Sequence, residues 1–329
     1  MTRLTLLAAL GATALGVLLA SALLGSSELS MLQAFAALWG GGDETARIIV
    51  WEIRLPRALA ALGVGMALGA SGALMQGLLR NPLAEPGVLG VSASASLGAI
   101  IALYFGISVL GAFTVPVFAI LGALAATGVL SGLASVRISA VQLILAGVGL
   151  SSFAGALGAL AMNLAPNRFA LSDMVSWMLG SVTNRSLDDL VFVAPFCLAG
   201  GVLALLTAPH LRALALGEET AQTLGVDLAR TRVGVIGAAA LLTGAAVAIS
   251  GVIGFVGIVA PHIVRPFVRH DPSDLVWPSA FLGGVLITLA DLVLRLVPLD
   301  QELRLGVMVS LIGAPVFILI AARSRGMGR

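Results

Sequence analysis

Long runs of apolar residues dominate the chain, and short polar segments separate them. Nine runs have about the length of 20 residues that a membrane-spanning helix needs. They are residues 5–24, 58–79, 88–106, 112–134, 140–162, 190–208, 233–252, 275–297 and 305–322. No internal repeat or long linker divides them, so the pattern predicts an all-α polytopic membrane protein with a single transmembrane domain, residues 1–329.

The stretch from Gly234 to Phe267 is too long for one span. As one helix it would reach about 50 Å at ~1.5 Å per residue, against ~30 Å of hydrocarbon. Gly251, Gly254 and Pro261 offer a break, so we expect two helices here, the second of them short. The prediction becomes ten transmembrane helices, an even number that places both termini on the same side of the membrane.

The arginines orient this arrangement. With both termini in the cytoplasm, eleven arginines lie inside: Arg3, Arg80, Arg137, Arg212, Arg230, Arg232, Arg265, Arg269, Arg323, Arg325 and Arg329. Seven lie outside: Arg47, Arg54, Arg57, Arg168, Arg185, Arg295 and Arg304. The excess follows the positive-inside rule, which predicts cytoplasmic termini.

The N-terminal run has a second interpretation. Arg3, the apolar run and the small residues Ala20, Ser21 and Ala22 also fit a cleaved signal peptide. The run is longer than a usual signal core, however, and its removal would spoil the even number of spans. We favour a retained first helix.

Composition excludes several function classes. Hydrophobic residues make up 59% of the chain and charged residues 10%, with a mean hydropathy of +1.08, whereas about a quarter of a soluble protein is charged. All 18 basic residues are arginine, so the chain lacks the lysine of a P-loop, and any ATP must bind to another chain. The formal charge of +2 does not suggest nucleic-acid binding. Cys197 is the single cysteine and no further ligand lies at metal-binding spacing from His262, so we expect no metal site.

Small residues recur at helical spacing inside the second run. Gly65, Gly69 and Gly72 form a stripe that Ala61 and Ala73 extend. Such stripes allow close approach of helix backbones in membranes, and we interpret this one as a packing surface.

The longest predicted cytoplasmic loop contains a short helix signal at Leu216–Gly225. Glu218 and Glu219 lie in its first turn, where the helix dipole favours acids, and Gly225 provides a stop. Leu216, Ala221 and Leu224 can share one apolar edge. A short amphipathic helix in this position suits docking to a soluble partner, and the alternative is a helix that lies in the membrane interface.

Charged residues also gather near the predicted outer face. Arg54 and Arg57 precede the second run, and Asp291 and Arg295 stand four apart, where they can pair along a helix. Such arginines either anchor helices by snorkelling or receive acidic groups from a partner, and the residues alone leave both interpretations open.

Several motifs occur in one order along nearly the whole chain. They are Trp51–Arg57 (WEIRLPR), Ser71–Gln76 (SGALMQ), Asn81–Pro86 (NPLAEP), Leu89–Ser92 (LGVS), Leu145–Val148 (LAGV), Trp177–Gly180 (WMLG), Leu216-Gly217, Gly254–Arg265 and Ile312–Phe317 (IGAPVF). In this set the chain resembles the FecCD-type permeases, the membrane subunits of ATP-driven importers for iron-siderophores, haem and vitamin B12.

The resemblance implies a type II ABC importer permease in the bacterial inner membrane. It implies a homodimer, two cytoplasmic ABC ATPase subunits that bind the ATP and magnesium, and a periplasmic substrate-binding protein. The chain itself would hold no cofactor and carry no enzyme activity. An iron-siderophore is the expected cargo, with haem and cobalamin as the other possibilities.

The resemblance also assigns roles to residues. Arg54, Arg57 and Arg295 match arginines that receive acidic side chains of the binding protein. Leu216, Gly217, Glu218, Ala221, Leu224 and Gly225 match the segment that couples to the ATPase. Ser139, Ala140 and Val141 match the loop that narrows the cytoplasmic end of the substrate path.

Two places depart from the family pattern. Ser94-Ala95-Ser96 stands where related chains usually carry a glycine-alanine pair, and Arg304 replaces a proline before the last helix. The second change adds a positive charge near the expected docking surface.

The main alternative is an ion-coupled secondary transporter of a small solute. It requires carboxylates or a broken-helix ion site near the middle of the membrane. The acids of this chain stand almost entirely in predicted loops or helix ends, with Asp291 as the nearest exception.

Overall fold

The computed structural model describes residues 2–25, 29–135, 139–297 and 303–324. All regular elements in these ranges are helical, and the ranges contain no strand. Seven of the described helices are long and apolar enough to cross a membrane. They are α1 (Arg3–Leu23), the continuous helix of α3 (Glu44–Ile48), η1 (Ile49–Arg54) and α4 (Leu55–Leu79), then α6 (Thr114–Ser135), α7 (Ala140–Asn163), α9 (Leu187–Ala215), α11 (Leu228–Ser250) and α13 (Pro272–Leu296).

Shorter helices complete the chain. Three of them are apolar: α5 (Val91–Tyr104), α12 (Val256–Val264) with its extension η3 (Arg265–Val268), and α14 (Leu305–Ser324). The others are α2 (Met31–Leu38), η2 (Ile107–Leu110), α8 (Arg168–Met178) and α10 (Glu218–Thr223). The nine apolar runs of the sequence therefore all appear as helices.

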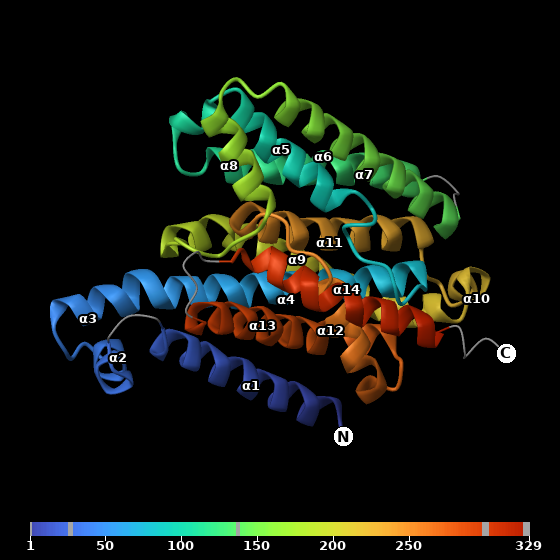
Figure 1. The fold of residues 1–329 in the computed structure, drawn as a ribbon. Coiled ribbons are helices and arrows are strands. Elements are labelled where there is room, and N and C mark those ends of the chain that lie inside the picture. Colours follow the sequence, from blue (N-terminus) through green and yellow to red (C-terminus); the bar gives the residue numbers. More distant parts are fainter. Residues whose placement is uncertain (1, 26–28, 136–138, 298–302, 325–329) are drawn as a thin grey trace.

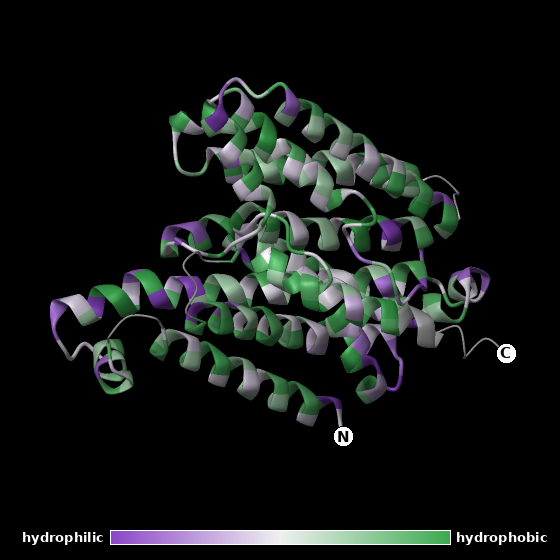
Figure 2. Cartoon of the chain, in the orientation of Figure 1, coloured by the Kyte–Doolittle hydropathy of each residue, from purple (hydrophilic) through white to green (hydrophobic). Residues whose placement is uncertain are grey.

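Helices α4 and α11 form the centre of the bundle. Most residues of both helices are buried. Helix α4 packs against α13, α11 and α12, and α11 packs against α6 and α9, while α5 joins α6 and α7 in a neighbouring layer (Figure 1). Hydrophilic residues concentrate at the ends of the helices, as a membrane-spanning bundle requires (Figure 2).

The glycine stripe of α4 lies where backbones touch. A Cβ atom on Gly65, Gly69 or Gly72 would overlap a backbone carbonyl oxygen of the facing helix, that of Gly283, Ser279 or Gly257 respectively. Ala61 and Ala73 extend the same buried surface. The predicted packing role of this stripe is confirmed.

The break in the long stretch near residue 250 is confirmed as well. Helix α11 ends at Ser250, Gly251 has a φ of +66°, and α12 begins after Phe255, which has a φ of +67°. Pro261 takes no part in this break, because it lies inside α12.

The second span begins earlier than its apolar run suggests. The helix runs without interruption from Glu44 to Leu79, about 54 Å at ~1.5 Å per residue, and therefore extends beyond ~30 Å of hydrocarbon. The π-helical turn η1 ends at Arg54, two residues before Pro56. A proline ring clashes with the carbonyl four residues back, and the wider winding accommodates it without breaking the helix.

The start of the first helix, α1, and the end of the last described helix, α14, lie at the same end of the bundle (Figure 1). The start of α1 and the end of α14 are found at the end that carries α10, and α2 and α3 lie at the opposite end (Figure 1). We call these the α10 end and the arginine end, the latter after Arg54, Arg57 and Arg295.

Candidate functional site

Helix α10 is the short helix predicted at Leu216–Gly225. It runs over Glu218–Thr223, with both predicted acids in its first turn. Gly225 follows with a φ of +85°, and the N–H of Val226 donates to the carbonyl oxygen of Ala221 at 3.0 Å. This bond and the left-handed glycine form a Schellman stop, as the sequence indicated.

The expected shared apolar edge of this segment is wrong. Ala221 is fully buried, whereas Leu216 is 65% exposed and Leu224 is 62% exposed. Leu216 precedes α10 and Leu224 follows it, and both leucines point away from the bundle. The buried Ala221 marks the face of α10 that packs against the bundle.

An ion pair ties α10 to the two central helices. The Oε1 atom of Glu218 lies 2.8 Å from Nη2 of Arg232 on α11 and 3.9 Å from Nη2 of Arg80 at the end of α4. Arg232 is almost completely buried. A buried guanidinium requires a partner, so Glu218 fixes the first turn of α10 relative to α11.

A cleft next to α10 reaches the predicted gate residues. It encloses about 560 Å³, and Ser139, Glu218, Glu219 and Arg232 are among its lining residues. Ser139 begins α7 with a capping box, since the N–H of Gln142 donates to the Ser139 hydroxyl oxygen at 3.2 Å. Ala140 lines a smaller adjacent pocket and Val141 is exposed. The structure therefore brings the predicted gate residue Ser139 and the predicted coupling residue Glu218 to one cleft.

A further ion pair joins α9 to α13 at this end. Nε of Arg212 donates to Asp271 at 2.6 Å. Partial burial acts to raise the pKa of Asp271, but hydrogen bonds from Ser273 and Arg212 outweigh it and lower the pKa below its usual value. The carboxylate is thus charged at neutral pH and holds the start of α13 to the end of α9.

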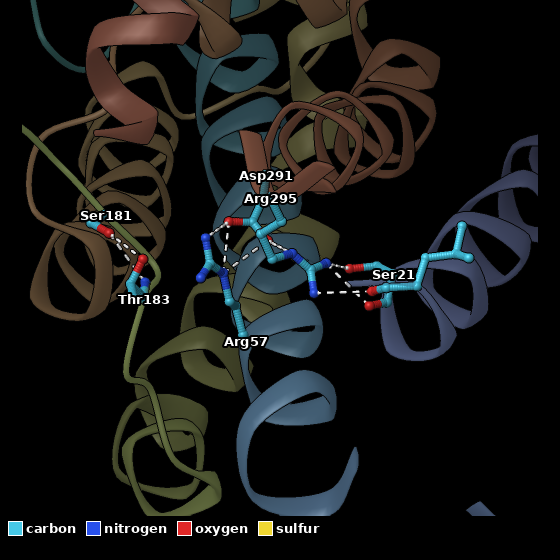
Figure 3. A network of polar contacts seen from close by, with 7 residues as sticks. Ser21, Arg57, Ser181, Thr183, Asp291 and Arg295 are labelled. Carbon is cyan, nitrogen blue, oxygen red and sulfur yellow. Dashed lines mark hydrogen bonds and ion pairs between the residues drawn. The ribbon is translucent and has the colours of Figure 1, made fainter. Parts of the chain in front are cut away.

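The arginine end contains a buried charge network (Figure 3). Asp291 on α13 is fully buried, with Oδ1 2.9 Å from Nη2 of Arg57 and Oδ2 3.1 Å from Nε of Arg295. The predicted pairing of Asp291 with Arg295 along the helix is confirmed. Arg295 also donates to the hydroxyl and the carbonyl oxygen of Ser21 on α1, so the network joins α1, α4 and α13.

Arg54 lies at the same end. It is 4% exposed and donates from Nη1 to the carbonyl oxygen of Leu23, the last residue of α1. The three predicted docking arginines are therefore close to one another, and each binds groups of its own chain. Arg57 and Arg295 share the carboxylate of Asp291.

Comparison with known proteins identifies the family, because residues 13–323 match the FecCD transport family. The chain belongs to the FecCD transport family. This FecCD permease is 41% identical over 302 residues to the ABC transporter permease protein YvrB of Bacillus subtilis, covering 90% of the chain and 85% of that relative. It is 36% identical over 316 residues to the hemin transport system permease protein HmuU of Yersinia pestis, covering 94% of each.

Other relatives are named for a different cargo, vitamin B12. The FecCD permease is 39% identical over 283 residues to the vitamin B12 import system permease protein BtuC of Klebsiella pneumoniae, covering 86% of the chain and 85% of that protein. A solved structure of a metal-chelate type ABC transporter in an inward-facing conformation matches with a TM-score of 0.83 and 31% identity, covering 98% and 99% of the two chains. The resemblance found from the motifs is confirmed, and the protein is a multi-pass ABC transporter permease.

The structure also shows two residues of this FecCD permease whose roles the motifs did not indicate. Glu85, between α4 and α5, accepts a hydrogen bond from the backbone N–H of Phe255 and so supports the left-handed residue before α12. Burial raises the pKa of Glu85 to about 7, and this hydrogen bond opposes the rise. The other is Arg232, the partner of Glu218. An acid between Pro82 and Pro86 was a visible signal for the first residue, whereas nothing local marks Arg232 as a partner of α10.

Proposed function

We propose that this chain is the membrane-spanning subunit of an ATP-driven importer that moves a metal chelate across the bacterial inner membrane. In this proposal two copies of a ten-helix subunit form the path, and an iron-siderophore is the first candidate for the cargo. The relatives named for hemin and for vitamin B12 support the chelate class and keep these two cargoes as the other candidates.

The orientation follows from the arginine count and the position of α10. We place the α10 end in the cytoplasm, and with it the start of α1 and the end of α14. The arginine end then faces the periplasm, where Arg54, Arg57 and Arg295 receive acidic side chains of a substrate-binding protein. The position of three arginines close together at one end of the bundle supports the docking role, because charge complementary to that of a partner steers and orients it.

The geometry of α10 is the observation that carries the proposal. Leu216 and Leu224 present exposed apolar side chains on either side of a helix that is fixed to α11 through Glu218. We propose that a soluble ATPase subunit covers these leucines. Its movement would pass through Glu218 to Arg232, and across the shared cleft to Ser139, Ala140 and Val141 at the start of α7.

Purification of the tagged chain in mild detergent tests the assembly directly. Cells that express their own partners should yield a co-purifying P-loop ATPase, identified by mass spectrometry. The ligand of an accompanying binding protein would name the cargo. Recovery of the permease without an ATPase would contradict the importer and favour the ion-coupled secondary transporter.

The variant Glu218→Arg is expected to separate ATP hydrolysis from uptake. It places a third positive charge beside Arg232 and Arg80, so α10 loses its attachment to α11 while the spans remain intact. Transport and ATPase rates are measured in the reconstituted complex. The charge exchange Glu218→Arg with Arg232→Glu should recover part of the coupling, and full transport by Glu218→Arg alone would refute the assignment.

Reversal of Arg54 and Arg57 to glutamate is expected to weaken binding of the periplasmic protein. The change replaces attraction by repulsion toward acidic partner groups. Affinity is measured on the permease in nanodiscs, with Arg47→Glu on the exposed part of α3 as the matched control and a melting curve to verify folding. Unchanged affinity in a folded double variant would favour helix anchoring as the role of these arginines.

A further inference from the structure

Helix α2 exposes the face that carries its large apolar side chains and buries the face that carries its alanines. Met31, Leu32, Phe35 and Trp39 are exposed, with Leu32 at 82% and Trp39 at 80%. At ~3.6 residues per turn these four positions fall within an arc of about 100° on one face of the helix. In water this pattern is reversed, because an amphipathic surface helix turns its apolar face toward the core.

The apolar face is held in position by the opposite side of the helix. Ala34 and Ala37 are fully buried in a small cluster with Leu23, Ala46 and Val50. The indole Nε1–H of Trp51 donates to the carbonyl oxygen of Ala37 at 3.2 Å. The direction of the exposed face is therefore fixed by the fold.

The N-terminus of α2 is capped. Ser30 and Gln33 form a capping box, in which the N–H of Ser30 donates to Oε1 of Gln33 at 3.0 Å. Such a cap satisfies backbone donors without water, which suits a helix start in a poorly hydrated environment.

The position of α2 matches the boundary of the hydrocarbon. Its buried cluster includes Leu23, the last residue of α1, and Figure 1 shows α2 beyond that end of α1. On α1 itself Leu15 and Leu19 are exposed. The apolar face of α2 therefore lies beside the end of a spanning helix that itself exposes large apolar side chains.

The chemistry of the face fits lipid better than a protein partner. Residues 29–42 contain no charged side chain. A protein docking surface is only about as apolar as the remaining surface and has a polar rim. Tryptophan, in contrast, is enriched where a bilayer meets water, and apolar helix faces enter the boundary between headgroups and acyl chains.

We propose that α2 is a membrane-interface anchor, with Met31, Leu32, Phe35 and Trp39 inserted into the bilayer surface at the arginine end. Because α2 also contacts α3 and η1, this anchor holds the protruding part of the long α3–α4 helix at the membrane surface. The anchor acts on the free subunit and requires neither an ATPase nor a binding protein.

Spin-label accessibility on the full chain in nanodiscs tests the anchor. Leu32→Cys is labelled in a chain that carries Cys197→Ala, and relaxation by oxygen, which enters lipid, is compared with relaxation by a water-soluble nickel chelate. We expect Leu32→Cys to respond mainly to oxygen. Arg47→Cys, on the exposed part of α3, is the matched control and should respond mainly to nickel.

Tryptophan quenching provides a second measurement. A chain in which Trp177 and Trp277 are changed to phenylalanine keeps Trp51, which α2 needs, and retains two tryptophans at the arginine end. Lipids brominated on the upper part of the acyl chain should quench much of the tryptophan fluorescence of this chain. The additional change Trp39→Phe should abolish most of the quenching.

The opposite results would overturn the proposal. Nickel access at Leu32→Cys together with no effect of bromine would place α2 in water. If addition of a periplasmic binding protein then blocked the nickel access, the face would be a protein docking surface.

Discussion

The variant Asp291→Asn is expected to destabilise the chain by about 3–5 kcal/mol, the range for breaking a buried ion pair by removing one partner. In the unchanged chain the carboxylate of Asp291 is fully buried and contacts Arg57 at 2.9 Å and Arg295 at 3.1 Å. The neutral amide removes the carboxylate charge that both guanidinium groups contact at a nearly solvent-free position. Because the network joins α1, α4 and α13, the loss should affect global unfolding.

Thermal unfolding in detergent, followed by tryptophan fluorescence, measures this effect. Asp173→Asn is the matched control, since Asp173 lies exposed on α8 and should change the melting temperature little. The triple variant Asp291→Leu, Arg57→Met, Arg295→Met should recover stability, because three apolar side chains then replace the three charged ones. Equal melting temperatures for Asp291→Asn and Asp173→Asn would contradict the structural role of the network.

The variant Gly69→Ala is expected to cost about 3 kcal/mol or more, at the upper end of the range for overpacked cores. The added Cβ would overlap the carbonyl oxygen of Ser279. This neighbour is backbone inside α13 and cannot rotate away as a side chain can. The two helices must therefore separate along their whole contact.

Gly63→Ala is a control within the same helix. No atom outside the immediate chain lies within 4 Å of a Cβ at Gly63, so this change should be neutral or stabilise the helix by up to ~1 kcal/mol. Melting temperatures and the yield of folded protein after membrane extraction distinguish the two variants. Similar values for both would show that the α4–α13 contact tolerates an added methyl group.

The spans were predictable because each carries its signal locally. A run of about 20 apolar residues specifies a membrane helix without reference to its neighbours. The break at Gly251 and the stop at Gly225 follow equally from the backbone freedom of a single residue. These features agree closely with the structure.

Short helices and side-chain partners were less accessible. Helices α2, α3 and α8 have 8, 5 and 11 residues, too few to show a span, although Ser30 with Gln33 and Asp43 were visible caps. The contact between Arg57 and Asp291 joins residues 234 positions apart. Only the packing of α4 against α13 creates that contact, so a single sequence can mark both residues as unusual without pairing them.

The unbroken helix from Glu44 to Leu79 can act as a rigid lever between the two ends of the bundle. One arm carries Arg54 and Arg57, and the other ends beside Arg80, 3.9 Å from Glu218. The tight backbone contacts at Gly65, Gly69 and Gly72 lie between the two arms and can serve as the fulcrum. With the pivot at Gly69 the two arms are about 37 and 15 Å long, so a tilt of about 5° shifts the Glu44 end by about 3 Å and the Leu79 end by about 1 Å in the opposite direction. A displacement on one face of the membrane then reaches the other face without any change inside the helix.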